Sequence, residues 1–572
     1  MNRKDSKFSR AVRDIRSAFI AVAVFSAAIN ILMLTGPLFM LQIYDRVMSS
    51  GSVPTLVALS VLVAGLYAVM GLFTFLRTRV MTRAGAWLDG RIGKDAMRVW
   101  ICRGVALGNP DALSHRPLAD LALVRAYIAT PALMALFDLP WFPFYLAVLF
   151  LFHFKLGLLG LAGAAVVTAL ALLNLYMTSR PLEVSAAIER NATAFAEQSY
   201  RNSEAVMAMG MLDNLSRYWE RLHRQAMHHG QRGSDRSEAI TSASKAFRML
   251  LQSALLAFGA YLALRHEISS GSIIAGSIIG GRALAPIDQT IAGWKHTLRA
   301  RRSYKRLKAY LAGVTDSAEK APTALPEPKG AVKVSNVVKL APDGSLDEDG
   351  RKRVILEDVN FELLPGAGLG VIGPSASGKT TLARLLTGVW MPDSGSVRLD
   401  GATLDQWDSN ILGRYIGYLP QSYELIAGTI AQNISRFDPQ ARDEDIIAAA
   451  MMASVHEMIL SLPDGYATHI GQSGSRLSAG QRQRIALARA VYRTPKLVVL
   501  DEPNSNLDSE GDAALTRAIE QLRMAGSAVV VMAHRPSAIA AVDDILMLGA
   551  GKQMDIGPKP EVLRRFTRIA NG

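Results

Sequence analysis

The chain has 572 residues, of which 50% are hydrophobic and only 20% carry a formal charge. This charged fraction is low for a soluble protein of that length, so a purely cytosolic enzyme is not expected. Lys and Arg outnumber Asp and Glu by 63 to 49, an excess that fits nucleic-acid binding, a membrane surface or membrane orientation. The single cysteine, Cys102, excludes an intramolecular disulfide framework and a metal site built from cysteines.

The N-terminal segment 1–17 is basic and precedes a long uncharged run. Six of its residues are Lys or Arg, and residues 18–43 carry no charge. A secretory signal peptide has an apolar region of only ~7–15 residues and a small-residue cleavage site, and neither feature fits this segment. We therefore predict an uncleaved first membrane span behind a basic cytoplasmic N-terminus.

Five further apolar stretches follow, at residues 55–76, 126–152, 156–179, 249–264 and 268–281. The stretch 126–152 is interrupted by Asp138, Pro140 and Pro143. The last two are short, and each alone would also fit a buried helix of a soluble protein. Because the stretches come in pairs joined by short loops, with long polar segments between the pairs, six membrane spans are predicted.

Lys and Arg are concentrated in the two long polar segments between the pairs. Nine lie in residues 77–125 and ten in residues 180–248, whereas the short loops 44–54, 153–155 and 265–267 hold about one each. The positive-inside rule then places both long segments and both chain ends in the cytoplasm. Membrane topology therefore explains the basic excess, and no nucleic-acid partner is expected.

Residues 312–330 contain three prolines and few apolar residues, as expected of a linker. After it, apolar β-rich segments alternate with helical ones, which is typical of an α/β domain with a mainly parallel sheet. The expected strands include 332–334, 354–356, 368–372, 497–500 and 528–532. The predicted organisation is a basic N-terminus (1–17), a six-span domain with long cytoplasmic helical extensions (18–311), the linker (312–330) and an α/β domain (331–565).

A glycine-rich loop directly follows one of these strands. Residues 373–380 fit G-x-x-x-x-G-K-[ST] and precede a helix. In this context the backbone N–H groups face phosphate oxygens, Lys379 neutralises the β- and γ-phosphates, and the Thr380 hydroxyl coordinates Mg²⁺. A chance glycine-rich turn is the competing interpretation, and the flanking strand and helix argue against it. The expected ATP-binding residues are Gly373, Pro374, Ser375, Ala376, Ser377, Gly378, Lys379, Thr380 and Thr381.

Two acidic residues end a second expected strand. Residues 497–500 are apolar and lead into Asp501 and Glu502. Carboxylates at the C-terminal end of a strand lie at the ligand-binding edge of such sheets, so we expect Asp501 to hold Mg²⁺ and Glu502 to polarise the attacking water. Alone, this pattern also fits a solvated loop. Together with the phosphate loop it predicts ATP hydrolysis.

A third motif carries a family resemblance. Residues 477–484, Leu-Ser-Ala-Gly-Gln-Arg-Gln-Arg, resemble the signature sequence of ATP-binding-cassette (ABC) transporters. The stretch between Lys379 and Asp501 has room for the helical subdomain that this family inserts there. The resemblance implies the ABC exporter fold, a membrane all-α six-helix transmembrane domain plus an α/β P-loop nucleotide-binding domain.

The resemblance also implies roles for further residues. Gln421 resembles the Q-loop glutamine, which serves catalysis and the Mg²⁺ site, and His534 resembles the switch histidine, which orients the attacking water. In the family, Ser478 and Gly480 contact the γ-phosphate held by a second copy of the domain. A chain with one cassette resembles a half-transporter, so a homodimer with two composite sites is expected. The implied catalytic set is Glu502, His534 and Gln421, and the nucleotide-binding set gains Ser478, Gly480, Gln481 and, in the D-loop 506–508, Asp508.

Two positions depart from the family pattern. The family usually stacks adenine on an early aromatic residue, yet residues 331–360 contain no Phe, Tyr or Trp, so the adenine contact stays unassigned. The signature has Ala479 where Gly is usual, and because a methyl group is a small change we expect activity to survive.

Shorter strings resemble the ATPase–permease subunits of bacterial type I secretion. They are 39–47, 137–141, 388–390 and 416–421. The resemblance implies ATP-driven export of an unfolded polypeptide with a C-terminal secretion signal across the inner membrane, with a periplasmic adaptor and an outer-membrane channel as partners. An exporter of lipids or small amphipathic molecules is the main alternative. A cassette ATPase acting on nucleic acid is a third, and the six spans argue against it.

The same resemblance bears on other segments of the membrane half. Some relatives carry an N-terminal cysteine peptidase domain, whereas only about 17 residues without cysteine precede the first span here. Coupling helices are expected near 117–127 and 205–219. Asp45, Arg46 and Asp138 lie near or within spans, where they could line the substrate path or pair structurally, and Asp45 and Arg46 could also simply lie in the membrane interface.

Overall fold

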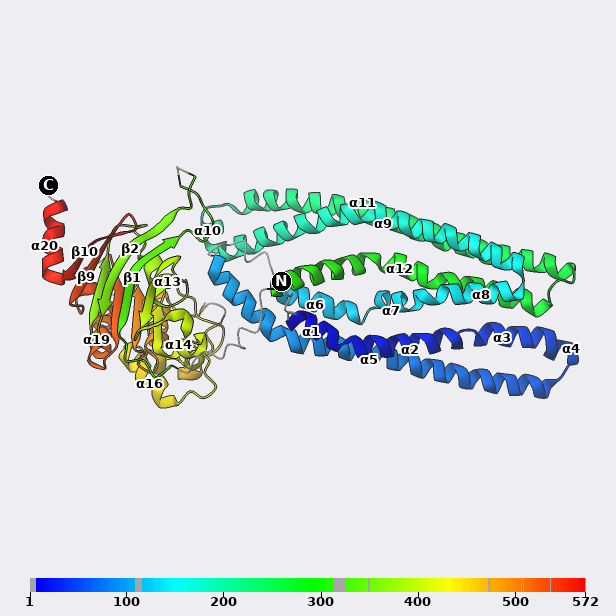
Figure 1. Ribbon diagram of the computed structural model, residues 1–572, viewed down its shortest axis with the longest axis horizontal. Helices are drawn as coiled ribbons and strands as arrows, with labels where there is room; N and C mark the ends of the chain where they lie inside the picture. Colours follow the sequence, from blue (N-terminus) through cyan, green and yellow to red (C-terminus); the bar gives the residue numbers. More distant parts are fainter. Residues whose placement is uncertain are drawn as a thin grey trace. The chain divides into compact units, whose positions relative to one another are not determined.

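The computed structural model describes residues 7–107, 116–312, 325–347, 350–471, 474, 476–505, 507, 509–534 and 536–570. Two compact units make up the chain: residues 1–104 with 110–316, and residues 105–109 with 317–572. The first is helical and the second contains the sheet (Figure 1). Most of the predicted linker, residues 313–324, lies outside the described residues.

The helical unit is a bundle of long helices (Figure 1). They are α1 (Lys7–Asp14), α2 (Arg16–Leu32), α3 (Thr35–Gln42), the π-helix η1 (Ile43–Val47), α4 (Met48–Ser50), α5 (Val53–Leu107), α6 (Pro117–Ile128), α7 (Pro131–Asp138), the 3-10 turn η3 (Leu139–Trp141), α8 (Phe142–Phe152), α9 (Phe154–Arg201), α10 (Ser203–Ala208), α11 (Leu212–Leu264) and α12 (Ser270–Leu311). Within the described ranges, six helical stretches are long and apolar enough to cross a membrane, which confirms the six predicted spans.

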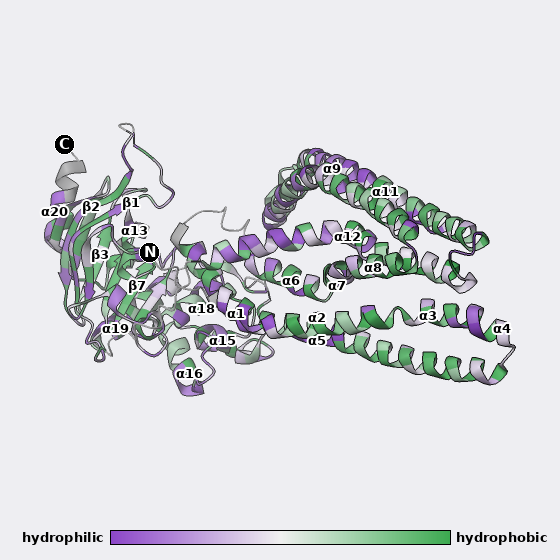
Figure 2. Cartoon of the chain, turned by 45° about the vertical axis from the view of Figure 1, so that its right-hand side comes forward, coloured by the Kyte–Doolittle hydropathy of each residue, from purple (hydrophilic) through white to green (hydrophobic). Residues whose placement is uncertain are grey.

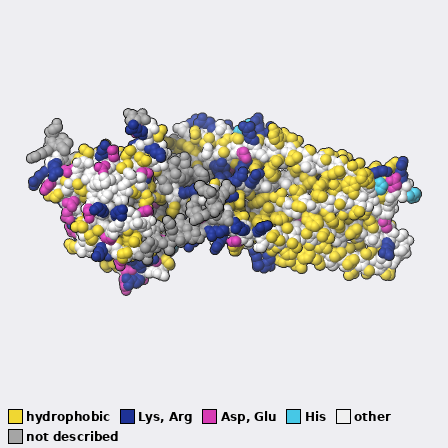
Figure 3. All heavy atoms as spheres, in the orientation of Figure 1, with side chains coloured by type: hydrophobic (Ala, Val, Ile, Leu, Met, Phe, Trp, Pro, Cys, Tyr) yellow, Lys and Arg dark blue, Asp and Glu magenta, His cyan; other side chains and the backbone are white. Residues whose placement is uncertain are grey.

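Apolar side chains cover these helices. Figure 2 shows α2 and α5 coloured mostly hydrophobic, and Figure 3 shows an apolar band between the hairpin end of the bundle and its Lys- and Arg-rich part. A helix with many exposed apolar side chains is stable only in lipid or against another chain. Leu151 and Tyr176, for example, are 84% and 85% exposed. The unit therefore has the surface of a multi-pass membrane protein.

The short connections are tighter than predicted. Most of the expected loop 44–54 is helical, because η1 and α4 continue α3 up to Ser50 and the chain turns only at residues 51–52. Gly51 permits this turn with a φ of 65°, a left-handed value that favours glycine. The α8–α9 connection is a single residue, His153. The interruption of the third span is η3, which contains Pro140, and Pro143 lies in the first turn of α8, where a missing N–H is tolerated.

Asp138 pairs with side chains inside the bundle. Its two carboxylate oxygens accept hydrogen bonds from Arg77 of α5 at 2.9 and 3.1 Å, and Asn30 of α2 donates to it at 2.9 Å. The Tyr145 hydroxyl of α8 donates to the Asn30 side-chain oxygen at 3.0 Å. The sequence left open whether Asp138 lines the substrate path or pairs with other side chains, and the structure shows that it is paired.

At the end of the bundle opposite α10, the described helices join in three hairpins: α3 to α4 with α5 (first), α8 with α9 (second) and α11 with α12 (third). Two carboxylates connect these hairpins. Asp45 in η1 accepts hydrogen bonds from the Ser269 hydroxyl at 2.5 Å and from the Gly271 N–H at 2.8 Å, so it caps the N-terminus of α12. Glu267, between α11 and α12, lies 3.0 Å from His153 Nε2 and 3.2 Å from Lys155 Nζ. Asp45 thus also pairs structurally.

The two segments expected as coupling helices differ in their setting. α6 is a helix over Pro117–Ile128, but it packs along α12, where its Asp120 forms an ion pair with Arg306. Residues 108–115, which precede it, lie outside the described residues. The second segment is a short helix, α10, followed by a turn at Gly210, whose φ is 63°, and then by the start of α11.

The described part of the second unit contains a ten-stranded sheet. Its strands are β1 (Val332–Leu340), β2 (Val354–Leu363), β3 (Gly368–Ile372), β4 (Ser394–Leu399), β5 (Ala402–Thr403), β6 (Ile416–Leu419), β7 (Leu497–Asp501), β8 (Ala528–Met532), β9 (Asp544–Gly549) and β10 (Lys552–Pro558), in the order β5-β4-β1-β2-β10-β9-β3-β8-β7-β6. The helices are α13 (Lys379–Leu386), α14 (Ser409–Tyr415), α15 (Ile430–Ile434), α16 (Asp443–Met452), α17 (His456–Leu460), α18 (Ala479–Val491), α19 (Ser509–Met524) and α20 (Lys559–Ala570), with 3-10 turns η5 (Leu404–Gln406), η6 (Gly465–Ala467) and η8 (Pro536–Ile539).

The predicted parallel sheet forms the core of this unit. β9, β3, β8, β7 and β6 pair in parallel, and every residue of β7 and β8 is buried. Strands covered on both faces are expected to be apolar, as these are except for Asp501 at the end of β7. The pairs β1–β2, β1–β4 and β4–β5 are antiparallel, which the sequence did not predict. β3, β7 and β8 end at one edge, where the segments that follow them meet.

Candidate nucleotide site

The glycine-rich loop connects β3 to α13 in the strand–loop–helix arrangement that the motif requires. Two of its glycines are needed for close contact. A Cβ at Gly373 would lie 2.2 Å from the Leu548 carbonyl oxygen, and a Cβ at Gly378 would lie 2.5 Å from Leu356 Cδ2. Gly378 also has a φ of 99° at the N-cap of α13. The loop is therefore held tightly over the sheet edge, with the N-terminus of α13 facing it.

Lys379 is the first residue of α13 and is buried. Its ammonium group donates hydrogen bonds to the carbonyl oxygens of Gly373 and Pro374 at 2.8 and 2.9 Å. Burial lowers the pKa of Lys379, while the nearby carboxylates of Glu502 and Asp501 act in the opposite direction. The cation is thus held in the loop where phosphate oxygens would be neutralised.

Asp501 ends β7 and is 1% exposed. Among the described residues, neither of its buried carboxylate oxygens has a hydrogen-bond partner within 3.5 Å. Burial raises the pKa of Asp501, and the nearby Thr380 hydroxyl acts in the opposite direction. A buried acidic group without a partner is costly unless a cation or donor satisfies it. Two orphaned oxygens near the Thr380 hydroxyl and the phosphate loop fit the oxygen ligands that Mg²⁺ prefers.

Glu502 and His534 face each other beyond the two strand ends. Glu502 Oε1 lies 3.0 Å from His534 Nε2, although the residues are on segments that follow β7 and β8 respectively. Glu502 has a φ of 52°, a left-handed backbone value that is uncommon for a non-glycine residue and often marks a functional position. The carboxylate and the imidazole are in direct contact, so a water molecule would be bound beside the pair and not between its two members.

A groove of about 350 Å³ brings most of the predicted residues together. It is lined by loop and helix residues 375–381, by Gln421 and by Glu502 and His534. Gly373 and Pro374 form the start of the loop, and Asp501 is buried rather than lining the groove. The described residues of this groove therefore combine a phosphate loop, a glutamine, a carboxylate and an imidazole.

The signature residues do not line this groove. Ser478 caps α18 through a capping box, in which its hydroxyl accepts from the Gln481 N–H at 3.2 Å and its own N–H donates to Gln481 Oε1 at 2.9 Å. Gly480 lies in the first turn of the same helix. Asp508 lies outside the described residues.

Sequence reasoning missed the residues at one end of the groove. Pro342, Asp343, Arg353 and Ile355 line it together with the phosphate loop, and they come from the β1–β2 connection and the start of β2. It also missed Gln483 of α18, whose side chain donates to the Pro503 carbonyl and so joins the signature helix to the segment after Glu502. Gln483 lies within the signature string 477–484, which was the signal that could have singled it out.

Comparisons with known proteins agree with this architecture. Residues 356–505 match the ABC transporter family, and residues 19–101 and 112–279 match the ABC transporter transmembrane region. The fold is that of a solved bacterial Atm1-family ABC exporter with ATP bound, with a TM-score of 0.77, 22% identity and 96% of each chain covered.

Three curated relatives match along nearly the whole chain. The type I secretion system ATP-binding protein PrsD of Rhizobium meliloti is 46% identical over 559 residues, 98% of this chain and 94% of the relative. The toxin RTX-I translocation ATP-binding protein of Actinobacillus pleuropneumoniae and the alpha-hemolysin translocation ATP-binding protein HlyB of Escherichia coli are each 28% identical, with 97% of this chain and 78% of the relative covered. These relatives confirm the predicted resemblance and do not favour the lipid or small-molecule alternative. The chain belongs to the ABC transporters, in the family of type I secretion ATP-binding proteins, and its cassette is a transporter ATPase.

Proposed function

We propose that the protein uses ATP hydrolysis to export an unfolded polypeptide with a C-terminal secretion signal across the bacterial inner membrane, as the ABC component of a type I secretion system. The observation that carries this proposal is the combination, in one chain, of six apolar helical spans and a groove that joins the phosphate loop to Glu502 and His534. The names of the relatives, which refer to type I secretion and toxin translocation, supply the substrate class.

The proposed working unit is a homodimer. Ser478, Gly480 and Gln481 do not line the groove of their own chain, so their proposed contact with the γ-phosphate requires a second copy. Each of two composite sites would then combine the phosphate loop of one chain with the signature, and with Asp508, of the other. Isologous pairing through a two-fold axis gives two equivalent sites.

Within each site, the chain's own residues bind and orient the nucleotide. Backbone N–H groups of residues 373–381 and the Lys379 ammonium hold the phosphates. Thr380, Gln421 and Asp501 are the proposed Mg²⁺ ligands, and the ion would neutralise charge on the phosphate oxygens. Glu502 accepts a hydrogen bond from the attacking water. His534, whose Nε2 lies 3.0 Å from Glu502 Oε1, donates to the γ-phosphate.

The base of ATP would lie against the non-aromatic end of the groove. Pro342, Arg353 and Ile355 line that end, and their stems and rings offer apolar and cationic surface to adenine. This assignment accounts for a site without an aromatic residue in 331–360.

Partners and location follow from the proposed system. The basic segments 77–125 and 180–248 favour a cytoplasmic ATPase and N-terminus. A periplasmic adaptor and an outer-membrane channel would receive the polypeptide at the other end of the spans, which are surrounded by membrane lipid.

The test uses a variant that binds ATP but turns it over slowly. Glu502→Gln protein purified with ATP and Mg²⁺ from the native host should retain a secreted polypeptide that mass spectrometry identifies, and the same polypeptide should disappear from the medium when the gene is deleted. Glu510→Gln, an exposed residue of α19, is the matched control and should turn over ATP normally. Stimulation of the ATPase by lipids, with an unchanged set of secreted proteins after deletion, would overturn the proposal.

A further inference from the structure

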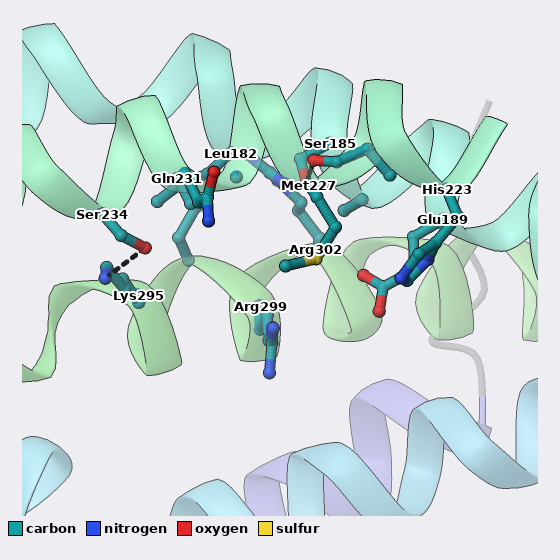
Figure 4. A pocket seen from close by; sticks show the side chains of 14 residues that line it. Leu182, Ser185, Glu189, His223, Met227, Gln231, Ser234, Lys295, Arg299 and Arg302 are labelled. Atoms are coloured by element: carbon teal, nitrogen blue, oxygen red, sulfur yellow. Dashed lines mark hydrogen bonds between the residues drawn. The ribbon is translucent and has the colours of Figure 1, made fainter. Parts of the chain in front are cut away.

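A groove in the helical unit carries a positive charge that its own residues do not balance. It has a volume of about 310 Å³ and lies between α9, α11 and α12 (Figure 4). Lys295, Arg299 and Arg302 of α12 line it, and Glu189 is the acidic residue among its lining residues. Apolar side chains, such as Met227, line other parts of the same groove.

The three cations occupy one face of α12, because residues spaced i, i+4 and i+7 lie one above the other on a helix. Arg302 is neutralised by Glu183 of α9 at 2.6 Å. Lys295 Nζ lies 2.9 Å from the Ser234 hydroxyl, which is a hydrogen-bond partner but carries no charge (Figure 4). Arg299 is exposed and, within the described part of the chain, forms no hydrogen bond or ion pair.

Lys295 and Arg299 are therefore two like charges four residues apart, and among the described residues neither forms an ion pair with a carboxylate, that of Glu189 included. Like charges at this spacing repel each other, and an anion placed between them would relieve the repulsion. The Gln231 amide and the Ser234 hydroxyl lie beside them on α11 and can pair with peptide groups. Cations, amides and apolar side chains in one groove match a polypeptide that carries acidic and apolar side chains better than they match a small inorganic anion.

The groove lies beyond the hydrocarbon layer. Lys295 comes 25 residues after Ser270, the first residue of α12, which corresponds to about 37 Å of helix. The hydrocarbon core of a bilayer is only ~30 Å thick. A charged ligand can therefore reach Lys295 and Arg299 without entering lipid, and the interior of the acyl chains is not available as their partner.

We propose that this groove binds an extended acidic segment of the transported polypeptide, with Lys295 and Arg299 as the ligands of its carboxylates. The inference rests on the proposed function. It adds that this groove favours acidic segments of the transported polypeptide. The phosphate of an anionic lipid headgroup is the competing occupant, and the experiment below separates the two.

The experiment measures binding of fluorescent peptides to the full-length protein in nanodiscs of phosphatidylcholine, by anisotropy. One peptide alternates Asp with Leu, and its matched partner has Asn at each Asp position. Lys295→Gln/Arg299→Gln protein should bind the acidic peptide at least tenfold more weakly than the unmodified protein, and added salt should weaken the unmodified protein's binding. The Asn peptide should bind weakly to both.

The matched control removes two charges from another face of the same helix. Arg301 and Lys305 are also four residues apart and exposed, but they do not line the groove. Arg301→Gln/Lys305→Gln protein should bind the acidic peptide within twofold of the unmodified protein. Basal ATP hydrolysis should be unchanged in both double variants, which shows that they are folded.

Equal binding of the acidic peptide by both double variants would overturn the proposal. It would also be overturned by two results together: phosphatidylglycerol in the nanodiscs abolishes binding of the acidic peptide, and the Lys295→Gln/Arg299→Gln variant still binds the peptide normally but retains less phosphatidylglycerol. Failure of the proposed function gives a different result, because Glu502→Gln protein would then capture no secreted polypeptide. If that variant captures its cargo equally well with and without Lys295→Gln/Arg299→Gln, the export function stands and the groove assignment fails.

Discussion

The Arg77 guanidinium of α5 lies 2.9 Å from the Asp138 carboxylate at the end of α7, inside the bundle of apolar helices. The two side chains are only 12% and 16% exposed. Ser26 of α2 accepts a further hydrogen bond from Arg77 at 3.0 Å. The ion pair thus connects three helices that are distant in the sequence.

We predict that Asp138→Leu destabilises the protein by on the order of 3 kcal/mol, because Arg77 keeps its charge in a buried place and loses its partner. Thermal unfolding of the purified protein in detergent measures the loss. Asp89→Leu breaks an exposed ion pair between α5 and α6 and should cost about 1 kcal/mol or less. Arg77→Met combined with Asp138→Leu should recover much of the stability, and a double variant less stable than Asp138→Leu would contradict this account.

His534→Ala should lower kcat for ATP hydrolysis by roughly 10²–10³-fold, because the imidazole beside Glu502 is one of the groups that orient the transition state. Nucleotide affinity should change little, since the phosphates are held mainly by the loop and Lys379. Steady-state hydrolysis and binding of a fluorescent ATP analogue separate the two effects. His469→Ala, at an exposed histidine of the same unit, should retain full activity. Equal hydrolysis rates for the two variants would show that His534 takes no part in the reaction.

The helical part of the cassette should show an acid-sensitive contact. Hydrogen bonds from Arg442 and Arg493 lower the pKa of Asp445 below its ordinary value of 3.8. A carboxyl group with a lowered folded-state pKa stabilises the protein above its unfolded-state pKa, and this stability is lost as the pH falls through the folded-state value. Arg493→Gln protein should therefore unfold at a lower temperature than the unmodified protein at pH 7.

The difference between the two proteins should begin to shrink as the pH falls below the unfolded-state pKa of about 4, and it should vanish only below the lowered folded-state pKa of Asp445 in the unmodified protein. Arg414→Gln, which removes an arginine without a carboxylate partner among the described residues, should leave the pH profile unchanged. A constant gap between Arg493→Gln and the unmodified protein from pH 7 to pH 3.5 would show that the ion pair does not report on Asp445.

Helix packing in the membrane unit should be sensitive to Gly293 of α12. A Cβ there would lie 2.5 Å from Ala132 Cβ and 3.2 Å from Ala132 Cα of α7, so the backbones must separate to admit a side chain. Gly293→Val should cost roughly 1–3 kcal/mol of stability, measured as a lower unfolding temperature in detergent. Gly71→Val in α5 meets no atom within 4 Å and serves as the matched substitution. Equal unfolding temperatures would show that α7 and α12 do not pack this closely.

The non-aromatic end of the nucleotide groove gives a fifth prediction. Ile355→Ala should raise KM for ATP about fivefold with little change in kcat, because it removes roughly 1 kcal/mol of apolar contact with the base. Val354→Ala changes the neighbouring residue, which points to the opposite face of β2 and does not line the groove. A KM that is unchanged in Ile355→Ala would place adenine elsewhere.

The phosphate loop could be predicted because its determinants are contiguous. An apolar strand, the glycine pattern and a helix opening at Thr381 lie next to one another in the chain, so local geometry follows from local sequence. The same holds for the spans, whose apolar runs determine their length and number. The strands β3 and β8 begin and end where the apolar runs 368–372 and 528–532 do.

Contacts between distant residues could not be predicted in this way. The partner of Asp138 is 61 residues away, and nothing near Asp138 distinguishes Arg77 from other basic residues. Arg353 lines the same groove as the phosphate loop because β1 and β2 pair in an antiparallel fashion before β3 begins. The helical continuation at η1 is stabilised by the bonds of Asp45 to the start of α12, which is more than 200 residues later in the chain.

Asp45 and Glu267 together have a mechanical consequence for the hairpin end of the bundle. Asp45 attaches the first hairpin to the third, and Glu267 attaches the second to the third. Separating any two of these hairpins within one chain breaks at least one charge-assisted contact, whereas displacing all three as a single body breaks none. A load applied to one hairpin by a bound neighbour is therefore shared by the other two.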